Sequence, residues 1–474
     1  MTETLDLNNA PAALPSTAER AAAGKQARKQ MPRGAHANLG LAAGRDPVAL
    51  IEREAEGRVA DLLPIRNARM STSALAFYRG TASLMAGDLA AAPATGLRAQ
   101  LCGDAHLSNF GAFAAPDRAL VFDLNDFDET HPGPFEWDVK RLAASFEIAG
   151  RHRGLSVEAR QALVLSAVGW YRRTMREFAG MTNLAVWYSR LDATRVTEML
   201  QGMRGTRGAR AIRHAGEKAR AKDSLRALGR LTELVDGERR IVSRPPLIVP
   251  IHELIPTDLD RNEVEDGIRQ LLRKYRRTLQ YDRRVLIEQY RFIDLAHKVV
   301  GVGSVGTRCW IALLLGRNDE DPLVLQVKEA SASVLEPYLG RARFANHGQR
   351  VVEGQRLMQA TGDIFLGWIR NPAALDGGSR DFYVRQLWDG KGSLDVETVP
   401  LEVFEPYAHI CGWTLARAHA RSADRIAIAS YLGKSDVFDR AVADYAADYA
   451  DVAEHDYDAL VRAVEDGRLP VSDG

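Results

Sequence analysis

The feature that most constrains the fold is a glycine-rich turn between two runs of strand-forming residues, Gly301-Val-Gly303-Ser304-Val-Gly306. Glycines let a backbone approach phosphate oxygens closely, so such a turn is a candidate nucleotide cradle. A dinucleotide-binding unit would need a helix after this turn. Instead, the run TRCWIALLLG is rich in β-branched, aromatic and aliphatic residues, and a turn and another strand-like run follow it. The pattern predicts an antiparallel β unit.

The next strand-like run of this region, LVLQVKEA, contains Lys328 near its end. In protein kinases, a lysine on the third strand contacts the α- and β-phosphates, and a glutamate on a helix orients it. The helical stretch RVVEGQRLMQ supplies Glu353 for that role. Each residue alone has an ordinary alternative, since lysine protects edge strands and glutamate is common on solvated helices. Together with the glycine loop, they predict a nucleotide-binding unit.

A second polar cluster lies much earlier in the chain, in the loop GDAHLSNFG and the strand-like run VFDLNDFDE. Magnesium takes oxygen ligands, usually one or two carboxylates plus substrate phosphates, which suits Asn109 and Asp123. Asp104 precedes Asn109 by five residues, the spacing of a catalytic base and a metal-binding asparagine, and His106 lies in the same loop. Asp and Asn also build turns, but the extended pattern favours a magnesium-type site.

The segment around this loop resembles the active-site core of aminoglycoside and choline kinase-like phosphotransferases. Their pattern runs His-Gly-Asp-x-His-x-x-Asn, then an Ile-Asp-Phe/Trp strand, then an Asp-Leu-Ala helix; here it reads CGDAHLSN, VFDLNDFDE and EWDVKRLA. The resemblance implies Asp104 as the catalytic Asp and both Asn109 and Asp123 as metal ligands. It also implies that Asp138 is a structural residue that braces the loop. Cys102 replaces the usual histidine, a departure that affects loop bracing more than chemistry.

The order of these parts is permuted relative to ordinary kinases, because the glycine loop and Lys328 follow the catalytic loop. A circular permutation resolves this order, since chain termini can move while the spatial arrangement is kept. The run EPYAHICGWTLARAHARS supports this interpretation, because it resembles the helix that leads into a kinase-like catalytic loop. We expect an α+β, protein kinase-like two-lobe fold, circularly permuted, with a helix-rich catalytic lobe and a small antiparallel β lobe.

The length of 474 residues is compatible with two lobes, because single cores stop growing at roughly 250–300 residues. Residues 1–45 are rich in Ala, Gly, Pro and basic residues without an apolar period, which predicts a mobile N-terminal arm. The other expected parts are 46–245, the catalytic-loop part of the helical lobe; 246–290, a connecting segment; 291–400, the nucleotide-binding β lobe; and 401–474, C-terminal helices that complete the helical lobe.

Composition narrows the range of partners. The net charge of +1 provides no overall field toward nucleic acid or an anionic membrane, so neither partner is expected. Three cysteines lie far apart, and no leader or membrane-spanning run is evident, which favours a cytoplasmic protein. Phrases such as FYRGTASLMAGDLA, GVGSVGTRCW and LARAHARSAD also resemble a widespread bacterial family known only as a domain of unknown function, over roughly residues 25–470.

These patterns predict an ATP- and Mg²⁺-dependent phosphotransferase that acts on a hydroxyl or amino acceptor, either a small molecule or a protein. Asp104 would orient or deprotonate the acceptor, and Lys328 would hold the nucleotide with the glycine loop. Nucleotidyl transfer by the same site stays open. Three arginines are candidate anion contacts: Arg79, Arg350 and Arg385.

Two other classes of function remain open at this point. A metal-dependent hydrolase would use Asp104, His106, Asp126 and Asp128 as ligands, although such sites usually draw on several histidines. A nucleotide-binding pseudokinase would bind ATP and a partner without turnover.

Overall fold

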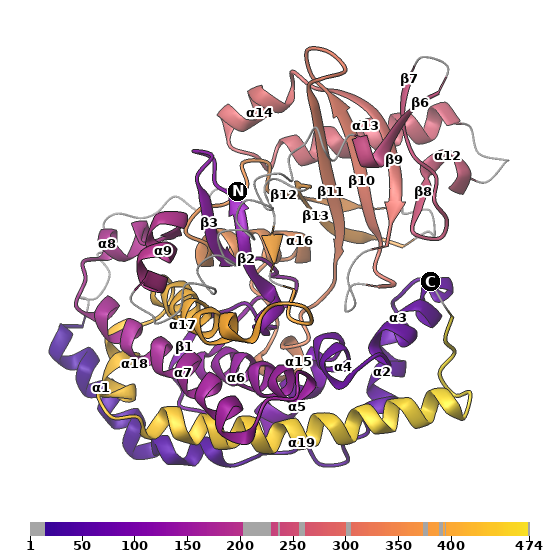
Figure 1. The fold of residues 1–474 in the computed structure, drawn as a ribbon. Coiled ribbons are helices and arrows are strands. Elements are labelled where there is room, and N and C mark those ends of the chain that lie inside the picture. The colour runs from indigo at the N-terminus through magenta and orange to yellow at the C-terminus, as the bar shows by residue number, and fades with distance from the viewer. Residues whose placement is uncertain are drawn as a thin grey trace.

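The computed structural model describes residues 15–201, 229–235, 238–255, 261–299, 305–372, 378–387, 392–393 and 395–472. Figure 1 shows a body of helices beside a body built on an antiparallel sheet. The fold therefore contains both helices and strands, with the strands in several separate antiparallel sheets. No helix within these ranges is long and apolar enough to cross a membrane.

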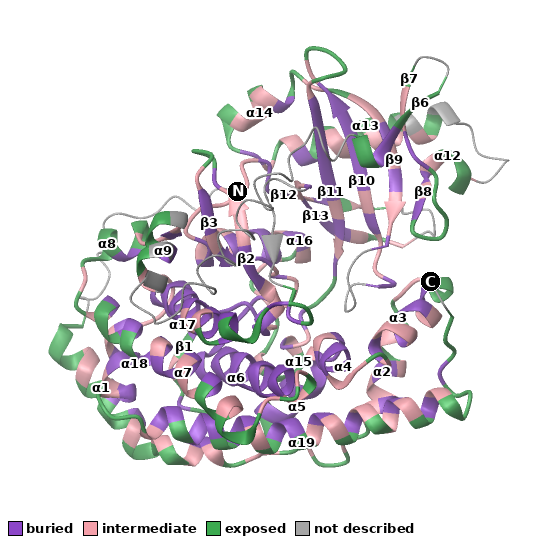
Figure 2. Ribbon diagram, viewed as in Figure 1, coloured by how far each residue is buried: buried purple, intermediate pink, exposed green. Residues whose placement is uncertain are grey.

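The helical body is built around α6 (Phe135–His152), which is buried along almost its whole length (Figure 2). Apolar residues such as Leu142 and Phe146 recur at helical spacing, and neighbouring helices cover the other sides as well. α7 packs against α17, and both α6 and α7 contact α19. The surrounding helices are α7 (Val157–Ala179), α17 (Phe404–Ala420), α18 (Arg425–Leu432) and α19 (Val437–Glu465).

Short helices from the N-terminal part of the chain complete this body. They are α2 (Pro47–Ala55), α3 (Leu63–Met70), α4 (Ala74–Gly80) and α5 (Ala82–Ala91). The other short elements are α8 (Asn183–Tyr188), α9 (Ala193–Gln201), α12 (Ile251–Leu254), α15 (Glu336–Leu339), η1 (Arg33–Ala37), η2 (Ala60–Leu62), η3 (Leu107–Asn109) and η4 (Leu401–Val403).

The second body is a six-stranded sheet with the order β12-β13-β11-β10-β9-β8. Successive residues of β10 enter different apolar clusters, with Ile311 and Leu313 in one and Ala312 and Leu314 in the other. Both faces are therefore covered, which explains why β10 reads as a continuous apolar run. The strands are β8 (Ile248–Pro250), β9 (Arg291–Lys298), β10 (Cys309–Leu315), β11 (Pro322–Ala330), β12 (Gly367–Asn371) and β13 (Arg380–Gln386).

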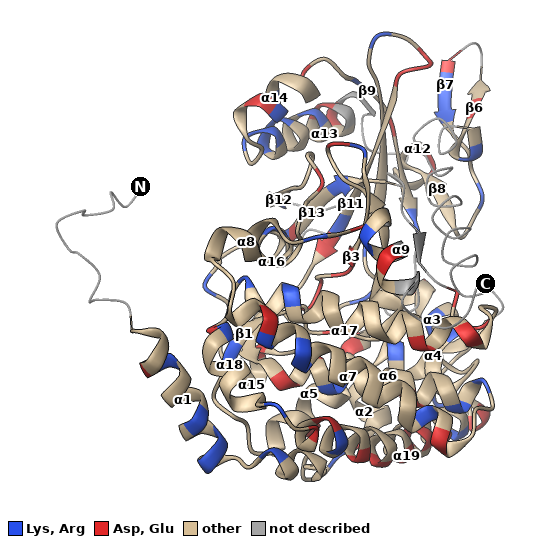
Figure 3. Cartoon of the chain, turned by 60° about the vertical axis from the view of Figure 1, so that its left-hand side comes forward, with Lys and Arg blue, Asp and Glu red and all other residues tan. Residues whose placement is uncertain are grey.

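Helix α16 (His347–Met358) follows β11 and packs against β11, β12 and β13. Helices α13 (Arg261–Arg276) and α14 (Tyr281–Ile287) lie within the segment that we expected to be a connector, residues 246–290. This segment also contributes to the sheet body, because Tyr275 is fully buried in the cluster under the sheet and donates its hydroxyl to the carbonyl of Phe365. Basic side chains gather on α1 and α13 (Figure 3), although the net charge is close to zero.

Three smaller antiparallel sheets accompany the six-stranded sheet. One of them pairs β1 with β4 in antiparallel register, which brings the loop after β1 beside the acidic segment before β4. The smaller sheets contain β1 (Arg98–Leu101) with β4 (His131–Pro134); β14 (Gly392–Ser393), β2 (Phe110–Ala114), β3 (Leu120–Leu124) and β5 (Leu191–Asp192); and β6 (Thr232–Val235) with β7 (Glu238–Ile241).

The predicted mobile arm, residues 1–45, is wrong for its described part. Residues Thr17–Gln30 form α1, which begins with a capping box between Ser16 and Glu19 and packs against α18. Contact is close because small residues face α18: a Cβ on Gly24 would lie 2.0 Å from the carbonyl oxygen of Ala427. Small residues carry little hydrophobic signal, so the sequence pattern missed this helix.

Candidate active site

The loop after β1 is fixed by a backbone conformation that favours glycine. Gly103 has a φ of 84°, and a Cβ there would lie 2.3 Å from the carbonyl oxygen of Glu129. An L-residue would therefore be strained and would collide with the acidic segment. The crossing of these two segments holds Asp104, the next residue, at the edge of a cavity.

Asp138 lies beneath this loop at the start of α6. Its carboxylate accepts hydrogen bonds from the backbone N–H groups of Cys102 (2.8 Å) and Gly103 (3.1 Å). His419 of α17 places Nε2 at 3.2 Å from the same carboxylate, and its Nδ1 is 2.9 Å from the hydroxyl of Tyr171. Asp138 thus occupies a bracing position, and His419 is a fully buried histidine within that network.

Asp104 is oriented by two contacts. The guanidinium of Arg141 donates from Nε to Oδ1 of Asp104 at 2.9 Å, and Arg141 is itself nearly fully buried. The side-chain amide of Asn109 donates from Nδ2 to the Asp104 carbonyl at 2.7 Å. This bond turns the amide oxygen of Asn109 away from that carbonyl and leaves it able to accept or to bind a cation.

His106 is buried in the same loop, and desolvation lowers its pKa to about 4, partly offset by Asp104. The imidazole is therefore neutral near pH 7. Because the backbone N–H of Ser108 points at Nδ1 (3.2 Å), we infer that the proton is on Nε2, which lies 3.6 Å from Oδ2 of Asp104.

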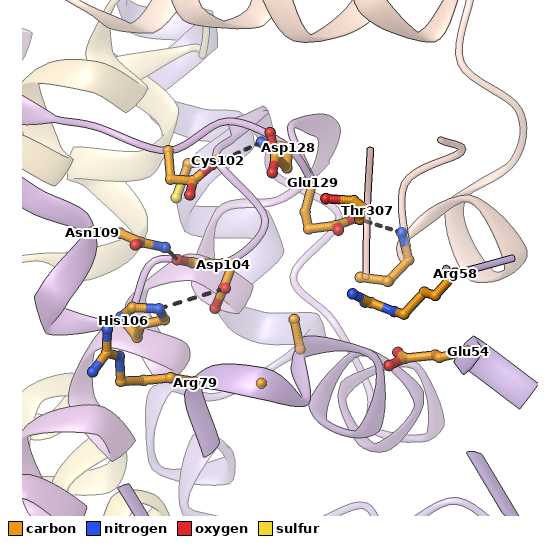
Figure 4. A pocket seen from close by; sticks show the side chains of 14 residues that line it. Glu54, Arg58, Arg79, Cys102, Asp104, His106, Asn109, Asp128, Glu129 and Thr307 are labelled. Atoms are coloured by element: carbon orange, nitrogen blue, oxygen red, sulfur yellow. Dashed lines mark hydrogen bonds and ion pairs between the residues drawn. The ribbon is translucent and has the colours of Figure 1, made fainter. Parts of the chain in front are cut away.

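A cavity of about 180 Å³ joins this loop to the acidic segment after β3 (Figure 4). Asp126, Asp128 and Glu129 line one side, whereas Arg58 comes from the segment after α2 and Arg79 from α4. The backbone of Asn125 donates to the carbonyl of Asn109 at 2.9 Å, which holds the two segments together. The remaining lining residues are Glu54, Gly80, Ala82, Cys102, Asp104, His106, Asn109, Thr307 and Val334.

Asp123 does not line this cavity, contrary to its predicted grouping with Asp104 and Asn109. Its side chain is fully buried and pairs with Arg417 of α17. Its second oxygen accepts from the backbone N–H of Ala360 at 2.9 Å. In β3, Asp123 shares the inward face with Val121 because side chains alternate along a strand. Asp126, which lies beyond the end of the strand, does line the cavity.

Lys328 of β11 meets the acidic segment although it lies in the other body. Its ammonium pairs with Asp128, and the hydroxyl of Tyr383 donates to the other oxygen of Asp128 at 2.7 Å. Burial alone would lower the pKa of Lys328, but the carboxylates of Asp126 and Asp128 outweigh it and raise this pKa well above its ordinary value. Lys328 is therefore a cation held over two carboxylates.

The predicted partner of Lys328 lies elsewhere. Glu353 is on α16 and pairs with Arg356 at 3.3 Å, three residues further along the helix, while Asp128 takes the place beside Lys328. Gly301, Gly303 and Ser304 lie outside the described residues. Gly306 is described: it has a φ of 87°, and its carbonyl accepts from the N–H of Val59 at 2.8 Å.

Two of the three predicted anion contacts are engaged by the protein itself. Arg350 donates to the backbone carbonyls of Asp128, Thr130 and Ser331. Arg385 donates to the side chain of Gln326 at 2.8 Å and to the carbonyl of Asn125 at 3.3 Å.

Within the described ranges, no three His, Cys, Asp or Glu side chains converge tightly enough to hold a metal by themselves. The set proposed for a hydrolase, namely Asp104, His106, Asp126 and Asp128, does not form such a cluster. A magnesium ion needs fewer protein ligands, since substrate phosphates and waters usually complete its coordination.

Sequence reasoning missed Arg58 and Arg141. It placed Asp126 in a hydrolase set rather than in the magnesium-type site, although Asp126 lies just beyond the apolar strand. Arg58 and Arg141 carried no signal, since Arg58 comes from the distant segment after α2 and Arg141 lies on a helix that is buried along almost its whole length.

Comparison with known families adds one assignment. A model of a bacterial family, described as "Uncharacterized protein conserved in bacteria (DUF2252)", matches residues 58–463. The chain belongs to this family. The matched range includes the catalytic-type loop, the acidic segment and Lys328. No functionally curated protein and no solved structure matches the chain.

Proposed function

We propose that this protein is an ATP- and Mg²⁺-dependent phosphotransferase. One observation carries the proposal: Lys328, on the sheet, pairs with Asp128, which lines the same cavity as Asp104 and Asn109. Residues far apart in sequence thus form one site with the components of phosphoryl transfer, namely a lysine, a carboxylate near an acceptor and oxygen ligands for a metal.

The arrangement of elements supports a circularly permuted kinase-like fold. Counting from β9, the glycine-rich segment follows the first strand, Lys328 lies on the third, and α16 follows after the short helix α15, an order similar to that of kinases. Helix α17 ends beside the catalytic-type loop, because the N–H of Gln100 donates to the hydroxyl of Ser422 at 2.9 Å. Joining the chain there would restore the usual order of helix and loop.

The residues in the cavity fit a magnesium ion bound with nucleotide phosphates. Asn109 offers a side-chain oxygen, and Asp126 offers a carboxylate; these two match the small number of protein ligands that magnesium usually takes. Asp126 replaces Asp123 in this role, since Asp123 is engaged by Arg417. ATP and magnesium, when bound, would supply the phosphoryl group and offset its negative charge.

The chain's own groups have distinct tasks in this proposal. Asp104, held by Arg141, would orient an acceptor hydroxyl or amine and accept its proton as the acceptor bonds to the γ-phosphorus of ATP and the bond from that phosphorus to the departing ADP breaks. The ammonium of Lys328 pairs with Asp128 and would also donate hydrogen bonds to phosphate oxygens of a bound nucleotide. Neutral His106 limits the positive charge beside Asp104 and keeps that carboxylate available.

A nucleotide-binding protein without transferase activity is the second candidate. It is favoured by the pairing of Glu353 with Arg356, since kinases normally use such a glutamate to orient the lysine. Turnover of ATP with any acceptor would exclude this candidate, whereas binding without turnover across a broad acceptor screen would favour it.

Calorimetric titration of ATP into the purified full chain, with and without magnesium, tests the proposal. We expect binding that depends on magnesium and is lost in Asp126→Asn. Asp117→Asn is the matched control, because Asp117 is exposed and pairs with Arg190 far from the cavity. Unchanged ATP affinity in Asp126→Asn would contradict the assignment of the site.

A further inference from the structure

Arg79 is a cavity-lining arginine without a partner. It lies near the end of α4, and its Nε is buried without any hydrogen-bond partner. Throughout the described ranges, its guanidinium makes no ion pair or hydrogen bond. Figure 4 places Arg79 beside His106 at the edge of the cavity. Arg79 is half-buried, and a buried Nε without a partner is costly, so we look for a ligand that would face this guanidinium in the cavity.

Other arginines near the cavity show the contrast. Arg141 is committed to Asp104 (2.9 Å), and Arg350 to three backbone carbonyls. Arg58 donates to the carbonyl of Val305 at 2.7 Å. Each of these arginines fixes one segment against another, whereas Arg79 fixes nothing. Its guanidinium is therefore available for bidentate binding of an oxyanion.

Position separates Arg79 from the proposed nucleotide contacts. Arg79 lies beside His106, two residues from Asp104 (Figure 4), whereas Lys328 pairs with Asp128. Asp104 faces the acceptor in the proposed reaction, so a ligand on Arg79 lies on the acceptor side. The cavity has the volume of about six waters at roughly 30 Å³ each, which suits a small molecule.

We propose that Arg79 binds an oxyanion of the acceptor, so that the acceptor is a small hydroxyl or amino compound carrying a carboxylate or phosphate group. The inference rests on the proposed phosphotransferase function. It narrows the acceptor from any hydroxylated or amino metabolite to an anionic one, and it excludes polycationic acceptors from the preferred substrates.

Calorimetry of two probe anions, inorganic phosphate and acetate, tests this site in the full chain. Each is titrated with and without saturating ADP and magnesium, so that anion binding at Lys328 is blocked in one arm. We expect at least one probe to bind with ADP present, and binding to weaken at least about tenfold in Arg79→Gln, as for the loss of charge-assisted hydrogen bonds. Which probe binds more tightly distinguishes a phosphate from a carboxylate group.

Two variants control for indirect effects. Arg79→Lys keeps the charge but not the paired donors, so we expect an intermediate affinity if the variant is folded as judged by circular dichroism. Arg53→Gln removes an exposed arginine of α2 and should leave anion affinity unchanged.

The outcomes separate this inference from the proposed function. Magnesium-dependent ADP binding without an anion effect of Arg79→Gln overturns the anion site and leaves the nucleotide site standing. An equal loss of ADP affinity in Arg79→Gln also overturns the inference, because Arg79 would then belong to the nucleotide site. Anion binding through Arg79 without any ADP binding overturns the acceptor assignment together with the phosphotransferase proposal.

Discussion

Two carboxylates three residues apart, Asp123 and Asp126, belong to different regions of the molecule. Asp123 lies in the layer beneath the cavity, where Arg417 and the N–H of Ala360 occupy its oxygens. Asp126 lies in the wall of the cavity, beyond the end of β3. The same stretch of sequence thus supplies a buried structural residue, Asp123, and a cavity-lining residue, Asp126.

Asp123 and Asp126 are the same residue type and differ in what surrounds their carboxylates. Asp123 and Asp138 each satisfy buried donors from distant elements, and this role is structural. The carboxylates of Asp126 and Asp128 instead line the cavity, and Lys328 pairs with Asp128. Variants of the lower layer should therefore change stability, whereas variants of the wall should change binding.

The largest effect is expected from Asp123→Asn. Removing this charge leaves the guanidinium of Arg417 buried and uncompensated, which should lower the free energy of unfolding by about 3–5 kcal/mol. Asp126→Asn is the matched comparison and should destabilise the protein less, because Asp126 is only partly buried and Lys328 keeps Asp128 as its partner. Urea denaturation of both variants measures the difference. Equal destabilisation would remove the distinction between the two layers.

Gly103→Ala tests how closely the loop and the acidic segment approach. A positive φ and a collision with the Glu129 carbonyl should together cost about 2–4 kcal/mol of unfolding free energy. Gly154 has a similar φ of 67° but open space around it, so Gly154→Ala should cost only about 1 kcal/mol. Thermal or urea unfolding measures the stability of both variants. Equal losses of stability would show that the loop at Gly103 and the segment at Glu129 are not closely packed.

Lys328→Met tests the wall of the cavity. Losing the charge-assisted contacts of this ammonium should weaken magnesium-dependent ATP binding about tenfold to a hundredfold, or about 1.5–3 kcal/mol. Lys434→Met is the control, because Lys434 is exposed on the helical body. Titration calorimetry measures both affinities. An unchanged ATP affinity for Lys328→Met would show that Lys328 does not contribute to nucleotide binding.

Glu129 should produce the smallest effect, and it depends on pH. Burial raises the pKa of Glu129 to about 7 from an ordinary value of 4.5, so the native state holds this proton more tightly than the unfolded chain does. This stabilisation is complete below pH 4.5 and is lost as pH rises through 7. Glu129→Gln keeps the group neutral, so its stability relative to wild type should rise by up to about 2 kcal/mol between pH 5 and pH 8.

Urea denaturation of both proteins at pH 5 and pH 8 measures this difference. A gap between Glu129→Gln and wild type that is equal at the two pH values would contradict the raised pKa. The comparison between the two proteins cancels the contribution of other titrating groups.

Sequence patterns predicted the strands around Lys328 and the loop around Asp104 because local periodicity and turn residues specify them. They did not separate Asp123 from Asp126, since the distinction depends on Arg417, which approaches from a distant helix. The same limit applies to α1, whose small residues become meaningful only against α18. In both cases the outcome depends on a partner that is distant in the sequence, which local patterns do not reveal.

A crystal structure of the full chain with Mn²⁺ and a non-hydrolysable ATP analogue tests the central claim most directly, because manganese can be located by anomalous scattering. We expect a manganese ion bound by Asn109 and Asp126, with phosphate oxygens at Lys328 and no ligand at Asp123. Manganese bound at Asp123, or the analogue bound away from Lys328, would contradict it.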